Sequence, residues 1–379
     1  MIVFNNSSVF TGDLWLLDQS VVVEGGVVSH IVETKNRPRG GEQIDLQGEM
    51  LVPGFIDVHV NGGAGELLNH QPNALSINAI GKIHRQFGTT SFIPTLITDT
   101  WEQMVNAVLA VAAAQEAGVD GVLGIHLEGP YLNIERRGVH SQDSIRQPAS
   151  DEDLSRLFAP LAAGAIRLMT LAPEQVPQGF IQQLLRHNVI VSAGHTAANY
   201  SQMVEALGQG VSGFTHLFNA MTPMSSREPG VVGAALDDQN SWCGVIVDDY
   251  HVHAVTLRQA LKAKTRGKMM LVTDAMHTVG AAAGEFDLMG APIVSNNGRV
   301  TTLDGTLAGS NLDMASAVRN TVNILGLDLS EALRMASLYP AQFLGSDQSL
   351  GRIAVGCRAD FALLNEQLQV LQTWVGGRP

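Results

Sequence analysis

The most constraining feature of the sequence is a series of eight short apolar runs, most of them separated by segments with helical spacing. Runs of this kind are typical of buried parallel strands, and strand–helix alternation is typical of a sheet covered by helices. Eight units in about 230 residues fit a (β/α)₈ barrel of the TIM type. A doubly wound open sheet has the same periodicity and stays open as an alternative. The runs cover residues 51–58, 90–94, 122–127, 166–171, 189–193, 213–216, 243–247 and 269–273.

The segments between these runs carry helix signals. Residues 75–87, 101–116 and 255–264 have apolar side chains at helical spacing or are rich in Ala and Val. Ser150 can cap a further helix that would extend to Leu157. We therefore expect helices to alternate with the strands through the middle of the chain.

Both ends of the chain show a different pattern. Short β-branched runs separated by turn residues fill the first part of the sequence, and the tail repeats this pattern. Two all-β pieces at opposite ends can pair into one unit. We expect a small β-sandwich domain formed by residues 1–50 and 349–379, and a catalytic barrel over residues 51–348.

Polar side chains follow six of the eight apolar runs directly. In a barrel, the carboxyl ends of the strands converge on one mouth, where active sites of this fold lie. A single His after an apolar strand is commonly structural, but six polar ends are harder to explain in that way. These ends carry Asp57, His59, His126, Glu128, His195, His216, Asn219, Asp248, His251 and Asp274.

Four of these residues suggest specific chemistry. Glu128, His195 and His216 supply one carboxylate and two imidazoles, which suits Zn²⁺ with a fourth position left for water. The same set suits Fe²⁺, and three unrelated polar strand ends remain an equal alternative. Asp274 ends an apolar run, where a carboxylate must be paired, hydrogen-bonded or catalytic. It could act as general base and then general acid, or only cap a helix.

Two further pairs are weaker metal candidates. His251 and His253 have H-x-H spacing, but the preceding strand is expected to end before Asp248, which places the pair in a loop or at a helix start. His59 and Asn61 resemble an H-x-H pair whose second His is replaced by a poorer ligand. Both pairs can be structural.

Charge and cysteine content exclude several classes of protein. The chain has 23 Lys+Arg and 36 Asp+Glu, a net charge of −13, which argues against nucleic acid or an anionic membrane as partner. Two cysteines do not make a disulfide framework, so a reducing cytoplasm is expected. The start lacks a basic region followed by a long apolar run, and the apolar helical stretch near residues 105–114 is too short to span a membrane.

Several stretches together resemble the amidohydrolase superfamily. PGFIDVH at 53–59 resembles its first-strand motif, and residues 351–360 resemble its closing β-segment. HLEGPYLN at 126–133 is similar to a motif of the N-acetylglucosamine-6-phosphate deacetylases within that superfamily. Further stretches similar to that family are SAGHT at 192–196, THLFNAM at 215–221, REPG at 227–230, LVTDA at 271–275 and GTLAGS at 305–310.

This resemblance implies a metal-dependent hydrolysis of the acetamide of N-acetylglucosamine 6-phosphate in amino-sugar catabolism. Glu128, His195 and His216 would hold one divalent metal per subunit, with zinc the first expectation and iron, cobalt, manganese or nickel the alternatives. Asp274 would be the general base and acid. Two positions after His59, where an H-x-H pair would have its second His ligand, this chain has Asn61. We therefore expect one tightly bound metal rather than two.

The resemblance also implies a substrate site and an assembly. Arg227 would reach the site of a neighbouring subunit in a homodimer, and a turn at residues 307–309 would close over the ligand. Because the chain is acidic overall and the implied substrate is an anion, the positive charge that binds it must be local. Arg136 and Arg137 are further candidates for this positive charge. The substrate-binding residues would be Val139, His140, Asn219, Ala220, Arg227, His251, Leu307, Ala308 and Gly309. A deacetylase for another N-acyl amino sugar, such as N-acetylgalactosamine 6-phosphate, and a catalytically silent binding subunit remain alternatives.

Overall fold

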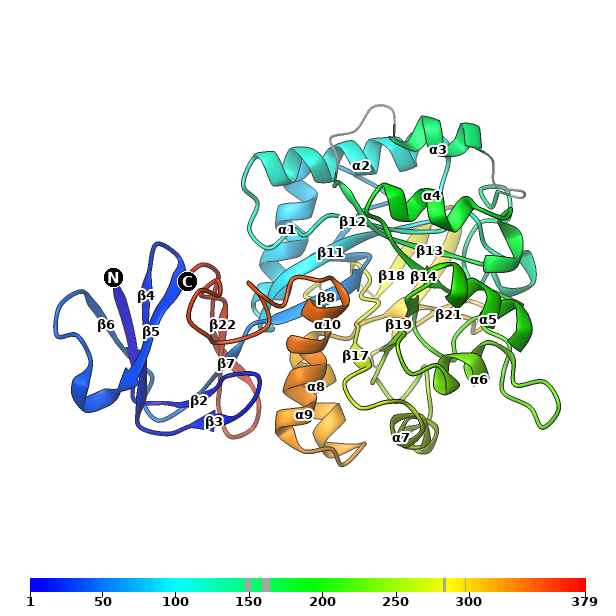
Figure 1. Ribbon diagram of the computed structural model, residues 1–379. Helices are drawn as coiled ribbons and strands as arrows, with labels where there is room; N and C mark the ends of the chain where they lie inside the picture. Colours follow the sequence, from blue (N-terminus) through cyan, green and yellow to red (C-terminus); the bar gives the residue numbers. More distant parts are fainter. Residues whose placement is uncertain (147–150, 159–163, 282–283, 297) are drawn as a thin grey trace.

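An eight-stranded parallel sheet forms the centre of the larger part of the molecule (Figure 1). The computed structural model describes residues 1–146, 151–158, 164–281, 284–296 and 298–379. Neighbouring strands of the sheet follow one another in the sequence, as in a (β/α)₈ barrel. In spatial order they are β8 (Phe55–Val60), β11 (Thr89–Ile97), β12 (Ile125–Glu128), β13 (Ile166–Leu171), β14 (Ile190–Ala193), β15 (Gly213–Phe214), β16 (Trp242–Val245) and β17 (Met269–Leu271).

The first and last strands of this sheet meet and close the barrel. The Asp274 N–H donates to the His59 carbonyl at 3.0 Å, and the Asn61 N–H donates to the Ala275 carbonyl at 2.9 Å. A parallel bridge between Val60 and Ala275 continues this contact. The predicted barrel is therefore confirmed, and the open-sheet alternative is wrong.

A buried carboxylate reinforces this closure. Asp57 is fully buried on β8, and it accepts hydrogen bonds from the Thr273 hydroxyl and from the Thr273 N–H at 3.3 Å. Burial raises the pKa of Asp57 to about 6, although the hydrogen bonds from Thr273 and His59 act in the opposite direction. The folded protein therefore binds this proton more tightly than the unfolded chain does.

We predict that Asp57→Asn changes the pH dependence of stability. The stability that protonation of Asp57 provides is present below about pH 4 and is lost as the pH rises through about 6, a loss of about 3 kcal/mol. Asp57→Asn lacks this ionisable group and therefore lacks the pH-dependent loss of stability. Its free energy of unfolding relative to the wild type should therefore rise by up to about 3 kcal/mol between about pH 4 and about pH 7. Chemical denaturation in the presence of a chelator measures this difference.

Asp45→Asn is a control of opposite sign. Asp45 is exposed, and hydrogen bonds from the Gln47 N–H and the Asn6 side chain lower its pKa. The stability that ionised Asp45 contributes is therefore present at neutral pH and lost as the pH falls. Because Asp45→Asn lacks this contribution, the variant should become less stable relative to the wild type as the pH rises. A pH-independent effect of Asp57→Asn would contradict the assigned ionisation.

Helices surround the barrel (Figure 1). Several begin at polar N-caps: the side chains of Asn73, Thr100 and Asn199 each accept a backbone N–H of the first turn. The expected helices at 75–87, 101–116 and 255–264 are confirmed, whereas Ser150 lies outside the described residues. The helices are α1 (Ala74–Arg85), α2 (Trp101–Glu116), α3 (Asp151–Phe158), α4 (Phe180–Arg186), α5 (Tyr200–Gln209), α6 (Gly230–Asp237), α7 (Ala254–Ala263), α8 (Met314–Asn323), α9 (Leu329–Ala336) and α10 (Leu338–Phe343), with 3₁₀ turns η1 (Thr34–Asn36), η2 (Ile134–Arg136) and η3 (Pro173–Gln175).

The two ends of the chain form two further sheets beside the barrel (Figure 1). The sheets share an apolar core in which Phe4 of one sheet meets Phe361 and Trp374 of the other edge-to-face, at centroid distances of 5.2 and 5.1 Å. One sheet has the order β5 (Val27–Glu33), β4 (Gln19–Glu24), β1 (Ile2–Asn5), β6 (Glu42–Asp45), and the other β23 (Val370–Trp374), β22 (Phe361–Leu364), β7 (Met50–Pro53), β2 (Ser8–Phe10), β3 (Trp15–Leu16). The small β unit from both ends is confirmed, and its exact domain limits stay a prediction.

The first apolar run was expected to be one strand, and the structure corrects this. Residues 51–58 are divided between β7, which pairs with β22, and β8 of the barrel. The break lies at Gly54, whose N–H donates to the Asp360 carbonyl at 2.9 Å. A Cβ at Gly54 would lie 2.2 Å from the side chain of Thr90 on β11. The chain therefore passes from one sheet to the other at a point where its backbone packs directly against a neighbouring barrel strand.

An antiparallel sheet follows the last barrel strand, and the sequence reasoning missed it. Its final strand includes residues 307–309, so the turn expected there is wrong. The turn lies just before them, where the Thr302 N–H donates to the Thr306 carbonyl at 2.9 Å. The sheet contains β18 (Glu285–Leu288), β19 (Ala291–Asn296), β20 (Arg299–Thr302) and β21 (Leu307–Ser310), and a separate small hairpin contains β9 (Gly62–Gly63) and β10 (Glu66–Leu67).

Within the described ranges, the helices are all too short or too polar to cross a membrane.

Candidate active site

A cavity of about 460 Å³ lies at the carboxyl ends of the barrel strands and contains most of the residues expected at the site. The barrel strands bring these residues together from distant parts of the sequence. Residues that line the cavity are Glu128, Val139, His140, His195, His216, Asn219, Ala220, His251, Asp274, Leu307 and Gly309, as expected, together with Asn61, Glu135, Arg136 and Arg299.

Four of these residues, among them Ala220 with a φ angle of 51°, have unusual backbone conformations. His195, His216 and Asp274 have φ angles of 49°, 34° and 53°, in the left-handed region that residues other than Gly rarely adopt. Such a conformation costs about 1–3 kcal/mol per residue and persists where surrounding structure enforces it, commonly at functional sites. His195, His216 and Asp274 each follow closely on a barrel strand, so the sharp turn occurs at the rim of the mouth.

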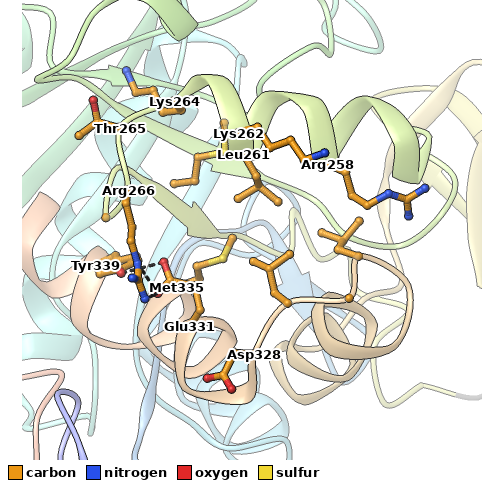
Figure 2. A pocket seen from close by; sticks show the side chains of 15 residues that line it. Arg258, Leu261, Lys262, Lys264, Thr265, Arg266, Asp328, Glu331, Met335 and Tyr339 are labelled. Atoms are coloured by element: carbon orange, nitrogen blue, oxygen red, sulfur yellow. Dashed lines mark hydrogen bonds and ion pairs between the residues drawn. The ribbon is translucent and has the colours of Figure 1, made fainter.

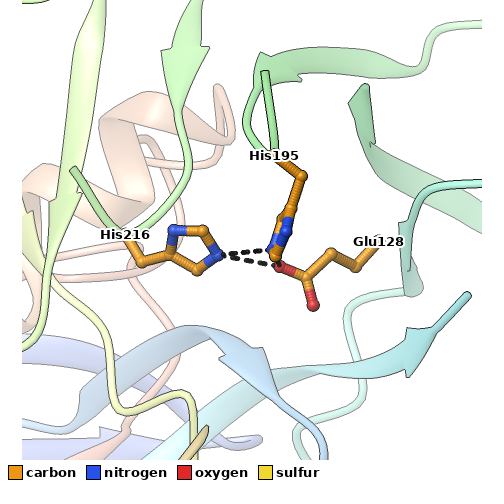
Figure 3. A group of neighbouring side chains, drawn as sticks. All are labelled: Glu128, His195 and His216. Carbon is orange, nitrogen blue, oxygen red and sulfur yellow. Dashed lines mark hydrogen bonds and ion pairs between the residues drawn. The ribbon is translucent and has the colours of Figure 1, made fainter. Parts of the chain in front are cut away.

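Glu128, His195 and His216 converge on one point (Figure 3). The Glu128 Oε1 lies 3.2 Å from His195 Nε2 and 3.0 Å from His216 Nε2, and the two Nε2 atoms are 3.1 Å apart. His195 Nδ1 lies 2.9 Å from the Arg136 carbonyl, which can only accept, so Nδ1 carries the proton. In this tautomer the Nε2 lone pair points at the carboxylate and at the second imidazole.

This donor set fits a small divalent cation. Ligands about 2.0–2.2 Å from a tetrahedral zinc ion are separated from one another by about 3.4 Å, close to the spacing found. Without a cation, converging lone pairs repel. Among the residues that the structure describes, this is the one group in which three His, Cys or carboxylate ligand atoms lie within 4.8 Å of one another.

The surroundings keep Glu128 ionised and favour the neutral forms of His140 and His216. Burial alone would raise the pKa of Glu128, but His59, His140, His195 and His216 hold it well below its usual range. Burial lowers the pKa of His216, and burial with the neighbouring His195 lowers the pKa of His140 to about 4. A carboxylate with neutral imidazoles is the protonation state that metal ligands need.

Asp274 lies beside this group and is held by a residue from the first strand. Its Oδ1 accepts a hydrogen bond from Asn61 Nδ2 at 2.6 Å, and His59 Nε2 lies 3.2 Å from the same oxygen. Burial would lower the pKa of His59, but the carboxylates of Glu128 and Asp274 raise it to about 9. Asn61 therefore orients the carboxylate of Asp274, a function that the sequence reasoning missed.

His251 is oriented by a carboxylate on its own loop. His251 Nδ1 lies 2.6 Å from Asp248 Oδ2, and Asp248 Oδ1 accepts the backbone N–H of His251 at 2.9 Å. The other ring nitrogen is thereby available toward the cavity. His253 accepts the Val255 N–H at the start of α7 and so caps this helix. This geometry supports the prediction that the His251–His253 pair is a weak metal candidate.

Two expected site residues do not line the cavity. The side chain of Ala308 is fully buried, in an apolar cluster beneath the antiparallel sheet. Arg227 is exposed in the loop before α6. Within one chain, neither residue contributes a side chain to the mouth of the barrel.

Glu174 supports the site and was not expected from the sequence. It follows β13 and accepts the Ala197 N–H at 2.7 Å, the Thr196 hydroxyl at 2.5 Å and Asn133 Nδ2 at 2.9 Å. The Asn133 N–H in turn donates to the His195 carbonyl at 2.9 Å. Glu174 thus joins the loop that carries His195 to the loop that follows Glu128.

A second cavity, of about 420 Å³, lies on the outer wall of the barrel between α7 and α9 (Figure 2). Its charged groups are largely paired with one another: Arg266 Nη2 lies 2.8 Å from Glu331 Oε2, and the Tyr339 hydroxyl donates to Glu331 Oε1 at 2.9 Å. Arg258 donates to the Ile324 carbonyl at 2.9 Å. This cavity lies at the start of β17 and not at the carboxyl ends of the strands, and its described residues lack the converging ligands of the mouth.

A closed (β/α)₈ barrel with a carboxylate and two imidazoles converging beside a further carboxylate defines a hydrolase of the metal-binding barrel class. Comparison with known proteins gives the family. Residues 50–379 match the model of the amidohydrolase family, and residues 1–51 match that of the NagA composite domain. The chain belongs to the amidohydrolase family, whose members typically bind a divalent metal.

Individual relatives are more specific. N-acetylgalactosamine-6-phosphate deacetylase of Shewanella sp. (strain ANA-3) is 43% identical over 88% of this chain and 83% of its own length. The crystal structure of N-acetylglucosamine-6-phosphate deacetylase from Pasteurella multocida is 36% identical, with a TM-score of 0.95 over 99% of this chain and 98% of that one. A Mycobacterium smegmatis mutant enzyme in complex with N-acetyl-D-glucosamine-6-phosphate is 30% identical, with a TM-score of 0.90 over 100% and 98% of the two chains.

Proposed function

We propose that this hydrolase removes the acetyl group from N-acetylglucosamine 6-phosphate and produces glucosamine 6-phosphate and acetate. The observation that carries the proposal is the convergence of Glu128, His195 and His216 beside Asp274. Relatives that share the fold over nearly the whole chain are named as deacetylases of amino-sugar phosphates. The two free cysteines support a cytoplasmic enzyme of amino-sugar catabolism.

Glu128, His195 and His216 would hold one divalent ion, for which zinc fits the ligand types and spacing. When bound, such an ion can lower the pKa of a water from 15.7 to about 7 and polarise a carbonyl group. An acetamide is a poor electrophile, so its hydrolysis needs both effects. A second metal would need a ligand where this chain has Asn61, which instead donates to Asp274.

Asp274 supplies the proton transfers. Its carboxylate would take a proton from the attacking water as the new C–O bond forms, and it would give that proton to the amine nitrogen as the C–N bond breaks. Asn61 fixes the carboxylate for both steps. His251, held by Asp248 through Nδ1, would in its imidazolium form donate a hydrogen bond from Nε2 to the oxygen that becomes negative in the tetrahedral state.

The sugar phosphate would lie across the rest of the mouth. The Ala220 N–H contacts no acceptor among the described residues, which leaves it free to donate to a phosphate oxygen. Asn219 precedes it on the same loop, and Val139 and His140 also line the cavity. Leu307 and Gly309 would cover the sugar from the antiparallel sheet, with Ala308 buried behind them.

Arg227 would complete the phosphate site from a neighbouring subunit of a homodimer. It is exposed and does not line the cavity of its own chain, which agrees with a function across an interface. We predict that Arg227→Ala raises KM for the phosphorylated substrate by about 10–100-fold, since a hydrogen bond to a charged group contributes about 1.5–3 kcal/mol. KM for the free sugar should change little.

Subunit mixing tests the direction of this contact. A subunit with Asp274→Asn retains Arg227, and a subunit with Arg227→Ala retains Asp274. Mixed dimers would contain one complete site and should regain activity that neither variant has alone at low substrate concentration. No recovery in dimers shown to be mixed would rule out the contact across subunits.

N-acetylgalactosamine 6-phosphate is the second candidate substrate, favoured by the relative at 43% identity. Acetate release should be measured with both N-acetylhexosamine 6-phosphates and both free sugars, and kcat/KM values compared. The proposal expects N-acetylglucosamine 6-phosphate to have the highest value. A higher value for the galactosamine isomer would replace the assignment, and release from none of the four would favour the silent binding subunit.

A further inference from the structure

Under the proposed function, the cavity of this acidic protein binds a dianionic phosphate. The positively charged groups that line the cavity are therefore the candidates for binding that phosphate. The permanently charged cations among its described lining residues are Arg136 and Arg299, since Arg227 does not reach it. Glu128, Glu135 and Asp274 supply negative charge to the same cavity. A phosphate that enters therefore needs at least one of the two arginines, in addition to any residue from a second subunit.

The backbone of Arg136 is fixed close to the expected metal ligands. Arg136 ends the 3₁₀ turn η2 and its N–H donates to the Asn133 carbonyl at 2.9 Å. Its own carbonyl accepts the Nδ1 proton of His195 at 2.9 Å. The side chain of Arg136 thus starts from a point that is rigidly linked to His195, whereas Arg299 is exposed at the start of β20, an inner strand of the antiparallel sheet.

The side chain of Arg136 lacks the carboxylate partner that Arg146, Arg266 and Arg334 have. It is half-buried, and its Nε is shielded from solvent with no hydrogen-bond partner among the described residues. No carboxylate of the described chain lies within ion-pair distance of it, although Arg146, whose Nε is also unpartnered, pairs with Asp153 at 3.0 Å. A shielded guanidinium nitrogen without a hydrogen-bond partner is costly unless a ligand pairs with it.

We propose that Arg136 binds the phosphate group of the substrate from within the same subunit and thereby determines the preference for phosphorylated sugars. The inference rests on the proposed function. A guanidinium can bind two phosphate oxygens with parallel charge-assisted hydrogen bonds. Arg136 would act together with the Ala220 N–H of its own chain, and Arg227 would approach from the partner.

The test compares Arg136→Gln with Arg137→Gln in the metal-loaded enzyme. Arg137 is the next residue, is exposed, does not line the cavity and donates to Gln142 at 3.1 Å, so it is a matched control. Arg136→Gln should lower kcat/KM for N-acetylglucosamine 6-phosphate by about 10–100-fold and leave the value for N-acetylglucosamine within about threefold. Arg136→Lys, which retains the charge without the planar fork, should be intermediate.

Binding gives a readout that is independent of turnover. In the Asp274→Asn background, calorimetry should show about 10–100-fold weaker binding of N-acetylglucosamine 6-phosphate when Arg136→Gln is added, with unchanged metal content and melting temperature. Mixed dimers with Asp274→Asn subunits should not rescue Arg136→Gln, because the residue acts in its own subunit.

The possible outcomes distinguish a failure of the inference about Arg136 from a failure of the proposed function. Equal losses for phosphorylated and free sugar, wild-type affinity of Arg136→Gln, an equal effect of Arg137→Gln or rescue in mixed dimers would each overturn the inference while leaving the deacetylase assignment in place. If the wild type releases no acetate from either hexosamine 6-phosphate and does not bind them, the proposed function itself is wrong.

Discussion

Asp274→Asn should lower kcat for acetate release by about 10²–10⁴-fold, the range that positioned proton transfer contributes. The amide cannot accept the proton of the attacking water, and it cannot return that proton to the amine nitrogen. Asn is nearly the same size as Asp and can still meet Asn61 and His59, which lie 2.6 and 3.2 Å from Asp274 Oδ1. Substrate affinity and metal content should therefore stay close to those of the wild type.

Asp249→Asn is the matched control for this change. Asp249 is exposed on the loop that carries His251 and, like Asp274, has a positive φ angle, 66°. The control should retain wild-type kcat. Steady-state kinetics together with calorimetric binding separate the two effects, and near-normal turnover of Asp274→Asn would remove Asp274 from its assigned function.

Glu128→Gln should release the metal. Glu128 is the one carboxylate of the converging set, and it faces four imidazoles: His59 at 3.4 Å, His140 at 3.6 Å, His195 at 3.2 Å and His216 at 3.0 Å. Replacing the anion by a neutral amide removes a charged ligand, whereas changes to outer partners alone cost 10–100-fold in metal affinity. We expect affinity to fall by more than about 100-fold and activity to fall with it.

Glu135→Gln serves as the control for Glu128. Glu135 also lines the cavity, but it is exposed and outside the converging set. Elemental analysis after dialysis should find metal in the control and little in Glu128→Gln. Full metal content in Glu128→Gln would contradict the ligand assignment.

The barrel and the main site residues could be predicted because they depend on local patterns. Buried parallel strands require continuous apolar runs, and the residues just beyond them must meet at one end of the barrel. Glu128, His195, His216 and Asp274 all follow that rule. The pattern could not reveal that the first run divides at Gly54, because the break depends on contact with Thr90 and not on the run itself.

The supporting residues could not be predicted, because their partners are distant in sequence. Asn61 contacts Asp274 across 213 positions, so its sequence context indicated only a poor metal ligand. Glu174 joins two loops after different strands, and its neighbours give no sign of this. The antiparallel sheet that contains residues 307–309 consists of short, partly exposed strands whose alternation is weak, so the pattern does not reveal them, and the turn implied there by the family resemblance is wrong.

The most direct test of the account is a titration of metal-free protein with Zn²⁺ while acetate release from N-acetylglucosamine 6-phosphate is measured. The account predicts no release without metal and a rise that reaches its plateau at one ion per chain, because Glu128, His195 and His216 form a single set of ligands. Release that persists after complete removal of metal, or a plateau at two ions per chain, would contradict it.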